Sequence, residues 1–294
     1  MMKKIFLSLL FIALIIGCFM IIFSDKKPKV SVVMLTYNRA NIVGQAIESI
    51  LNQTMKDFEF IILDDGSHDN TDEVIASYMA KDKRIKYYKN YINRGIAHSR
   101  NRVLKLAQAK YVMLMDDDDI SLPNRMKLQA DFLDKNPEID VVIGQIEGME
   151  KSDMEHGIIA SYLVVANNVG NANVMFRRDF TVKNDIFYDE SLVVSEDWDF
   201  WLSMLFSGAK FAGIKDYVIK RDNNSIKYYK AENFERSDEK VRQKIGQFFT
   251  PDNWQKFYEF DACKKVELFR EKKLFSESFG EKVYNLNKCT TNNL

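Results

Sequence analysis

The sequence predicts an α/β fold, in which a mostly parallel sheet carries helices on both faces and is preceded by one membrane-spanning helix. Two observations support the sheet. Apolar runs of strand length alternate with helical patterns over residues 30–115, and polar clusters follow three of these runs. Strands that alternate with helices are typical of parallel sheets. The third observation, an uncharged stretch from Ile5 to Phe23, predicts the preceding helix.

The composition is that of a globular protein without a strong overall charge. Apolar residues make up 46% of the 294 residues, which is enough for a sizeable core. Lys+Arg and Asp+Glu both number 42, so no net field attracts nucleic acid, and no nucleic-acid partner is expected. Any electrostatic function must therefore be local.

The stretch from Ile5 to Phe23 is long enough to cross a bilayer. At about 1.5 Å per residue, it reaches roughly the 30 Å of a hydrocarbon core. A cleaved signal peptide and a lipoprotein attached through Cys18 are alternatives, although the apolar run continues past this cysteine. We expect a single-pass anchor that makes the membrane a partner. The lysines on its two sides only slightly favour a catalytic domain on the cytoplasmic face in a bacterium.

The helices and strands are predicted from apolar periodicity. The predicted strands are 30–35, 58–63, 85–88 and 111–115, and the helices between them are 41–53, 71–79 and 95–108. A helix near 126–133, strands at 139–143 and 172–176 and a helix at 197–206 follow, and then charged amphipathic segments at 235–249 and 254–273.

Polar clusters follow three of the predicted strands. They are Thr36-Tyr37-Asn38-Arg39, Asp64-Asp65-Gly66-Ser67 and Asp116-Asp117-Asp118-Asp119. Ligands of parallel sheets bind outside the carboxyl ends of the strands. We therefore expect the three clusters to meet at one edge of the sheet and to form a binding site there.

The acidic run Asp116 to Asp119 suggests a cation site. Four adjacent carboxylates repel one another unless a cation lies among them, and Mg²⁺ and Mn²⁺ prefer oxygen ligands. A solvated turn that caps the following helix is the simpler alternative. An EF-hand loop is excluded, because its glycine and terminal glutamate are missing.

The other two clusters suggest a nucleotide. Tyr37 could stack on a base, Arg39 could face a phosphate, and an aspartate at 64–65 could accept a hydrogen bond from a nucleobase or a ribose. An Asp-Gly turn and an ordinary strand-to-helix loop are the corresponding structural alternatives.

Five short motifs in this order resemble the family 2 glycosyltransferases with the GT-A fold. They are VSVVMLTYNRANIVGQAIESILNQT, FEFIILDDGSHDNT, NRGIAHSRN, YVMLMDDDDISLPNRM and, at 195–201, SEDWDFW. The resemblance implies a Rossmann-like domain and an inverting glycosyltransferase. Such an enzyme would move a sugar from a nucleotide diphosphate-sugar, expected to be UDP-linked, to a glycan or lipid-linked acceptor with Mn²⁺ or Mg²⁺.

The resemblance also implies site residues. Tyr37 would lie against the uracil ring and Asp65 would bind its edge. The implied substrate-binding residues are Thr36, Tyr37, Arg39, Asp64, Asp65, Asn93, Arg100, Asp116 and Asp117. Asp118 would ligate the metal, and Asp119 is a further candidate ligand. Many relatives have a histidine near positions 220–225, where this chain has none. Either Asp222 or Asn223 is the candidate substitute as an oxygen donor, or this ligand is absent.

The candidate base lies in Ser195-Glu196-Asp197-Trp198. An acceptor hydroxyl must lose a proton as it attacks the sugar, and a nearby carboxylate can take that proton. The family pattern favours Asp197, with Glu196 as the second choice. Both residues could also stabilise the N-terminus of the following helix.

These inferences divide the chain into three parts. Residues 1–28 are the anchor and its basic flank, and 226–294 are a C-terminal helical extension. Between them lies a glycosyltransferase domain at 29–225, with a nucleotide-binding half at 29–120 and an acceptor half at 121–225. Two alternatives remain: a non-catalytic membrane-bound sugar- or nucleotide-binding protein, and a nucleotidyltransferase. The latter would need a basic phosphate-binding loop, whereas Thr36 to Arg39 offers one arginine.

Overall fold

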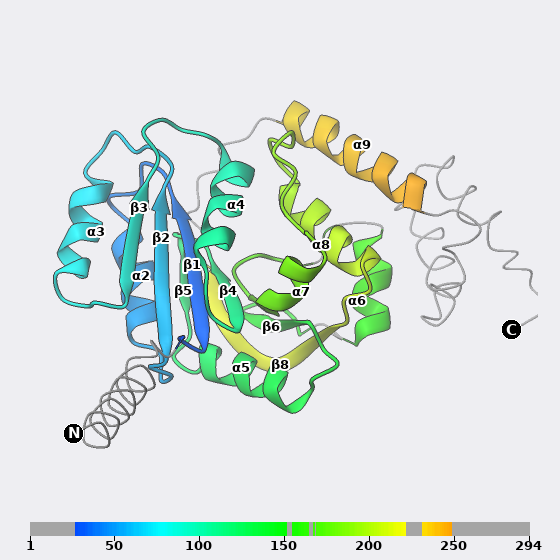
Figure 1. Cartoon of the computed structure of the whole chain (residues 1–294), viewed down its shortest axis with the longest axis horizontal. Helices are drawn as coiled ribbons and strands as arrows, with labels where there is room; N and C mark the ends of the chain where they lie inside the picture. Colours follow the sequence, from blue (N-terminus) through cyan, green and yellow to red (C-terminus); the bar gives the residue numbers. More distant parts are fainter. Residues whose placement is uncertain (1–26, 152–154, 165–166, 168, 222–230, 249–294) are drawn as a thin grey trace, which may run out of the picture.

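The computed structural model describes residues 27–151, 155–164, 167, 169–221 and 231–248. In this part of the chain, one eight-stranded sheet of order β3-β2-β1-β4-β7-β6-β8-β5 lies between helices (Figure 1). The strands are β1 (Val30–Thr36), β2 (Phe58–Asp64), β3 (Ile85–Lys89), β4 (Tyr111–Met115), β5 (Asp119–Ser121), β6 (Val141–Glu147), β7 (Val174–Arg177) and β8 (Phe211–Arg221). The helices are α2 (Val43–Leu51), α3 (Thr71–Met79), α4 (Ile96–Leu106), α5 (Arg125–Lys135), α6 (His156–Leu163), α7 (Arg178–Lys183), α8 (Glu196–Phe206) and α9 (Ala231–Phe248).

The first half of the sheet is parallel, as the alternating pattern predicts. β1 pairs with β2 and β4, and β2 pairs with β3, all in parallel. All seven residues of β2 and all five of β4 are buried. Strands covered on both faces read as continuous apolar runs, which is why these elements are visible in the sequence. Their carboxyl ends lie at one edge, where Thr36, Asp64 and Met115 end β1, β2 and β4.

The second half of the sheet is mixed. β7 runs antiparallel to both β4 and β6, and β5 runs antiparallel to β8, while β6 and β8 are parallel. The sheet therefore has four parallel and three antiparallel pairs. Asp119, the last residue of the acidic run, pairs with Arg221 in β8 and so belongs to the sheet itself.

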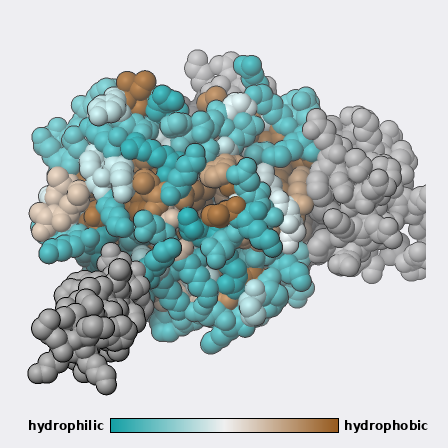
Figure 2. All heavy atoms as spheres, in the orientation of Figure 1, coloured by the Kyte–Doolittle hydropathy of each residue, from teal (hydrophilic) through white to brown (hydrophobic). Residues whose placement is uncertain are grey.

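Two apolar clusters fix the helices to the two faces of the sheet. Helices α2, α3 and α5 pack on one face, where Ile47 and Ile75 belong to the same apolar cluster as Phe60. Helices α4, α6, α8 and α9 contribute to the cluster on the other face, around Trp201 and Phe176. On the side shown in Figure 2, hydrophilic residues cover most of the described surface, and apolar atoms gather near its middle.

The predicted membrane-spanning helix requires a correction. Among the described residues, no helix is long and apolar enough to cross a membrane. The longest, α9, has 18 residues, and its lysines, arginines and acidic residues rule out burial in hydrocarbon. The predicted anchor at 1–28 falls almost entirely on residues 1–26, which lie outside the described part. For the described residues, the fold class is therefore corrected to an α/β sheet domain without a spanning helix, and the predicted single-pass location on a membrane is withdrawn with it.

Candidate active site

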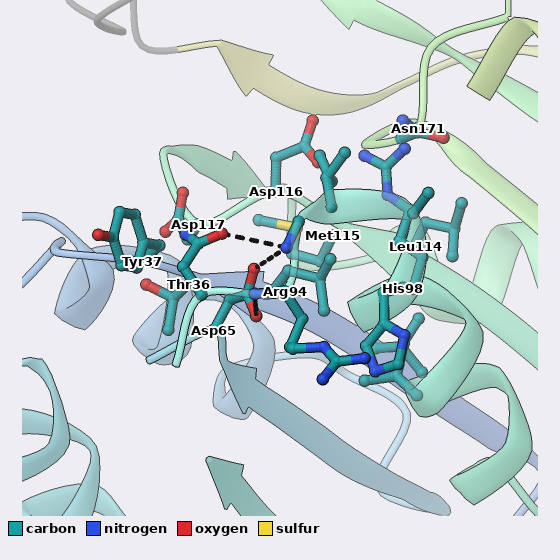
Figure 3. Close-up of a pocket in the computed structure, with 18 of the residues that line it drawn as sticks. Thr36, Tyr37, Asp65, Arg94, His98, Leu114, Met115, Asp116, Asp117 and Asn171 are labelled. Carbon is teal, nitrogen blue, oxygen red and sulfur yellow. Dashed lines mark hydrogen bonds between the residues drawn. The ribbon is translucent and has the colours of Figure 1, made fainter. Parts of the chain in front are cut away.

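A cavity of about 800 Å³ opens at the carboxyl ends of the parallel strands. It is lined by residues that follow β1, β2 and β4 and by the beginning of α4. In Figure 3, Tyr37 and His98 lie on opposite sides of the pocket, and Asp65, Asp116 and Asp117 lie between them. The three polar clusters therefore do meet at one site.

Most of the predicted substrate-binding residues line this cavity. They are Thr36, Tyr37, Arg39, Asp65, Asn93, Arg100, Asp116 and Asp117, together with the predicted metal ligand Asp118. The lining does not include Asp64, Asp119, Glu196 or Asp197. Asp222 lies outside the described residues.

Asp65 organises the loop between β3 and α4. Its Oδ1 accepts hydrogen bonds from Asn90 Nδ2 at 2.6 Å, from Ser99 Oγ at 2.8 Å and from the backbone N–H of Arg94 at 3.0 Å. Its Oδ2 accepts one from the backbone N–H of Gly95 at 2.9 Å. The carboxylate therefore fixes the loop that supplies Asn93, Arg94 and Gly95 to the cavity.

Asp64 has a different environment from its neighbour. As the last residue of β2 it is fully buried, and its carboxylate accepts hydrogen bonds from the Ser67 N–H at 2.7 Å and from Tyr87 Oη at 3.0 Å. The cavity lining includes Asp65, which follows β2, but not Asp64. The geometry gives Asp64 a role in shaping the turn.

The loop that follows β1 is held against the turn that follows β2. The N–H of Asn38 donates to Ser67 Oγ at 2.8 Å, and Asn38 Oδ1 accepts from the His68 N–H at 2.9 Å. The N–H of Arg39 donates to Thr71 Oγ1 at 2.9 Å. Asn38 has φ of 53°, a left-handed conformation that asparagine tolerates better than most residues. These contacts set the positions of Tyr37 and Arg39 in the lining.

The acidic run is positioned by a buried polar network beneath it. Arg125, fully buried at the start of α5, donates to the carbonyl oxygens of Leu114 at 2.7 Å and Val174 at 3.2 Å. Gln53 Nε2 donates to the carbonyl oxygen of Leu122 at 2.8 Å, and Gln53 Oε1 accepts from the Met126 N–H at 3.0 Å. The segment between β4 and α5 is thus fixed at both ends.

Burial and like charge make the acidic run a poor place for four carboxylates. Burial raises the pKa of Asp116, and it raises the pKa of Asp117 and of Asp119 to about 7, with the neighbouring aspartates adding to the effect. The guanidinium of Arg39 opposes the rise in pKa at Asp117, with Nε 3.7 Å from Asp117 Oδ1, and its Nη2 lies 3.8 Å from Asp118 Oδ2. A bound cation would favour the charged forms of Asp116, Asp117 and Asp119.

The donor atoms fit a metal ion that arrives with a diphosphate. Among the described residues, no group of three or more histidine, cysteine, aspartate or glutamate side chains is arranged to hold a metal by itself. Mg²⁺, however, is commonly bound by one or two carboxylates together with substrate phosphates. Asp116 and Asp118 face the cavity and could supply such carboxylates.

Arg100 links the two sides of the cavity. It is largely buried and forms an ion pair with Glu196 at the start of α8. The amide oxygen of Asn171 accepts hydrogen bonds from its guanidinium at 2.8 and 2.9 Å, and the ring of Tyr188 lies 5.3 Å away. Burial raises the pKa of Glu196, and Arg100 counteracts that rise. The carboxylate of Glu196 is therefore engaged in the ion pair with Arg100.

Asp197 is less engaged than Glu196. Its Oδ1 accepts a hydrogen bond from the N–H of Trp198 at 2.8 Å, and its Oδ2 lies 3.3 Å from the amide group of Asn171. Asn171 itself lines the cavity, so Asp197 lies next to a lining residue. The assignment of either carboxylate as base stays a prediction.

Several lining residues were not among the predicted ones. They are Arg94, His98, Asn171, Glu190, Leu192 and Val193, with apolar side chains from the strands and α4. Arg94 lies between two motif positions and could have been inferred from them. Asn171, Glu190, Leu192 and Val193 come from irregular segments, and no periodicity or spacing in the sequence marks them.

Gly66 is expected to be essential for the shape of the site. Its φ is +85°, and a Cβ there would lie 2.7 Å from the carbonyl carbon of Ile92 and 2.8 Å from the nitrogen of Asn93. Gly66→Ala should lower the free energy of unfolding by more than the roughly 1–3 kcal/mol of backbone strain alone, because the Asn93 loop must also move. Denaturant unfolding measures this change.

The matched control is Gly208→Ala. Gly208 has φ of +91° with nothing within 4 Å of the added Cβ, so it reports the strain without the collision. Equal losses of stability in the two variants would show that the close approach to Asn93 has no consequence.

Comparison with known proteins identifies the family. Residues 31–189 match the family model "Glycosyl transferase family 2". The uncharacterized glycosyltransferase MJ1057 of Methanocaldococcus jannaschii is 35% identical over 214 residues, which cover 67% of this chain and 73% of that protein. The chain belongs to glycosyltransferase family 2, and the protein is a glycosyltransferase.

Other relatives differ in length and in what their names state. The UDP-Glc:alpha-D-GlcNAc-diphosphoundecaprenol beta-1,3-glucosyltransferase WfgD of Escherichia coli is 30% identical over 180 residues, which cover 60% of this chain and 69% of that protein. The match spans only 16% to 18% of three longer uncharacterized glycosyltransferases from Rickettsia species.

Solved structures share the fold. S. aureus TarS 1-349 in complex with UDP-GlcNAc superimposes with a TM-score of 0.63 at 22% identity, over 72% of this chain and 65% of that chain. Mannosyltransferase PcManGT from Pyrobaculum calidifontis, in complex with GDP-Man and Mn2+, gives a TM-score of 0.58 at 14% identity, over 90% of this chain and 86% of that chain. At these identities the likeness concerns the fold alone, and it confirms the predicted GT-A architecture of the sheet domain.

Proposed function

We propose that the protein transfers a sugar from a UDP-linked donor to a glycan or lipid-linked acceptor, with inversion at the anomeric carbon and with a divalent metal ion. One observation carries this proposal. Tyr37, Asp65 and the acidic residues Asp116 and Asp118 line one cavity. An aromatic ring suits the face of a base, a carboxylate suits its edge, and two further carboxylates suit a metal-bound diphosphate.

The choice of nucleotide rests on the relatives. WfgD is named for UDP-Glc, and the TarS structure holds UDP-GlcNAc. PcManGT holds GDP-Man, so the fold by itself accepts more than one base. The higher sequence identity to WfgD favours UDP for this chain.

The reaction needs one proton acceptor and one site of charge stabilisation. In our proposal Asp197 takes the proton of the acceptor hydroxyl as that oxygen attacks the anomeric carbon from the side opposite the diphosphate. Asp118, with Asp116 beside it, would hold Mn²⁺ or Mg²⁺, and the bound ion would stabilise the charge that builds on the departing diphosphate. Glu196 stays paired with Arg100 and does not take the proton.

The acceptor and the stereochemistry are supported by one relative. WfgD forms a β-1,3 linkage on a GlcNAc-diphosphoundecaprenol acceptor. A β linkage is what inversion of an α-linked donor produces. We also propose a nucleotide-binding half at 29–120 and an acceptor half at 121–225 within the domain 29–225, and a C-terminal helical extension at 226–294 that contains α9.

A thermal-shift experiment tests the donor and metal sites together. UDP with Mn²⁺ should raise the melting temperature of the protein by roughly 5 °C or more at 100 times the dissociation constant, because a ligand of the native state stabilises it. Asp118→Asn should remove the part of the shift that requires Mn²⁺. Asp131→Asn, a distant change of the same kind on α5, should leave the shift unchanged.

Two results would count against the proposal. If neither UDP nor another nucleoside diphosphate stabilises the protein in an Mn²⁺-dependent way, the proposed donor site is wrong. If Asp118→Asn keeps the full response, the metal ligand is one of the neighbouring aspartates.

A further inference from the structure

Helix α9 packs against α8 and against the segment that precedes α8 (Figure 1). Val241 and Ile245 of α9 are buried, at 1% and 0% exposure, in the same apolar cluster as Trp201. Lys244 Nζ lies 2.6 Å from Asp199 Oδ1. This helix lies beyond residue 189, where the match to the family model ends.

One contact of α9 reaches the residue before the two acidic candidates for the base. Ser195 Oγ donates a hydrogen bond of 2.6 Å to Asp238 Oδ1 of α9. Ser195 has φ of 59° and ψ of 16°, a left-handed conformation that costs a non-glycine residue roughly 1–2 kcal/mol. The hydrogen bond to Asp238 helps hold the chain in this conformation just before it enters α8.

The backbone at Ser195 determines where Asp197 lies. The left-handed residue redirects the chain, and Glu196 and Asp197 are the first two residues of α8. Glu196, directly before Asp197, is paired with Arg100 of α4. Ser195, one residue further back, is hydrogen-bonded to Asp238 of α9. Asp197 therefore follows two residues that are each fixed to a different helix.

We propose that Asp238 is a positioning residue, which acts through Ser195 to hold Asp197 in the geometry required for proton transfer. This inference rests on the proposed function, because it takes Asp197 as the base. It also assigns α9 a part in the active site. A misplacement of about 1 Å can lower a rate by up to about 100-fold, so the effect should appear in turnover rather than in donor binding.

The test compares variants of the full chain for turnover and for donor binding. Turnover is the release of UDP from UDP-Glc or UDP-GlcNAc, whichever the unaltered protein uses, and binding is the thermal shift with UDP and Mn²⁺. Asp238→Ala should lower kcat between about 10-fold and 100-fold and leave the UDP shift and the donor KM within about twofold. Asp238→Asn, which keeps an acceptor for Ser195 Oγ, should restore kcat to within about threefold. Glu239→Ala, next along α9 and exposed, should leave kcat unchanged.

A second pair of variants tests the hydrogen bond itself. Ser195→Ala should lower kcat as much as Asp238→Ala, and the double variant should be no slower than either single one, because both remove the same contact. Ser195→Gly should retain more activity than Ser195→Ala, since glycine adopts the left-handed conformation without strain.

Three outcomes would overturn the inference. An Asp238→Ala variant with unchanged kcat would show that the contact has no role in turnover. Equal losses of kcat and of the UDP shift would indicate a general structural role. Additive losses in the double variant would separate the two residues. Absence of UDP release by the unaltered protein with every donor would instead contradict the proposed function, and the two failures are therefore distinguishable.

Discussion

Replacing Asp197 by asparagine is expected to lower kcat by about 10²–10⁴-fold, the range over which a positioned general base contributes to a rate. Asparagine has the same shape but cannot accept the proton. Because Asp197 does not line the cavity that would receive the nucleotide, the Mn²⁺-dependent shift with UDP should persist. The measurement is steady-state UDP release, with the thermal shift with UDP and Mn²⁺ measured on the same variant.

Glu196→Gln is the matched control for this prediction. Glutamine can still accept a hydrogen bond from Arg100, so the local structure should survive, and turnover should fall far less than in Asp197→Asn. If Glu196→Gln were the inactive variant and Asp197→Asn the active one, the base would be Glu196. Full activity of both would place the base elsewhere in the site.

Arg100→Met is expected to lower the free energy of unfolding by about 3–5 kcal/mol, because it leaves the buried carboxylate of Glu196 without its partner. Removing one member of a buried ion pair costs far more than removing an exposed charge. The effect is measured by denaturant unfolding. Lys105→Met, on the exposed side of the same helix, should change the stability by no more than about 0.5 kcal/mol.

The double variant Arg100→Met with Glu196→Gln tests whether the unpaired carboxylate of Glu196 causes the loss of stability. Without the carboxylate, methionine no longer leaves an unpaired charge, so the double variant should be more stable than Arg100→Met alone. A double variant that is less stable by the full sum of the two single effects would mean that Arg100 and Glu196 act independently.

The first half of the fold could be predicted from the sequence because its strands are covered on both faces. β1, β2 and β4 appear as unbroken apolar runs, and the observed bounds agree with the predicted ones to within one residue. β8 was not predicted, because its middle, with Lys215 and Asp216, is exposed and interrupts the apolar pattern. β5 is only three residues long, and its pairing with β8 is a long-range contact that no local pattern reveals.

The position of the site and most of its lining could be predicted, but not the direction of every carboxylate. The sequence places Asp64 and Asp65 side by side, and Asp116 to Asp119 in one run, and all six were named as candidates for binding substrate or metal. In the structure, the side chain of Asp64 is hydrogen-bonded to the turn that follows β2, and Asp119 belongs to the sheet. Asp65 and Asp116 to Asp118 line the cavity. Side-chain direction depends on where each strand ends, within one residue, which is finer than a pattern can define.

The contacts of α4 limit how this fold can be divided. Arg100 is paired with Glu196, and Asn101 Nδ2 donates to the carbonyl oxygen of Tyr188 at 2.9 Å while Asn101 Oδ1 accepts from its N–H at 2.8 Å. Two adjacent residues of α4 thus contact the chain on both sides of position 189. Recombination between homologues at that boundary would separate Arg100 from Glu196, so α4 and the stretch from Tyr188 to Glu196 should be exchanged together.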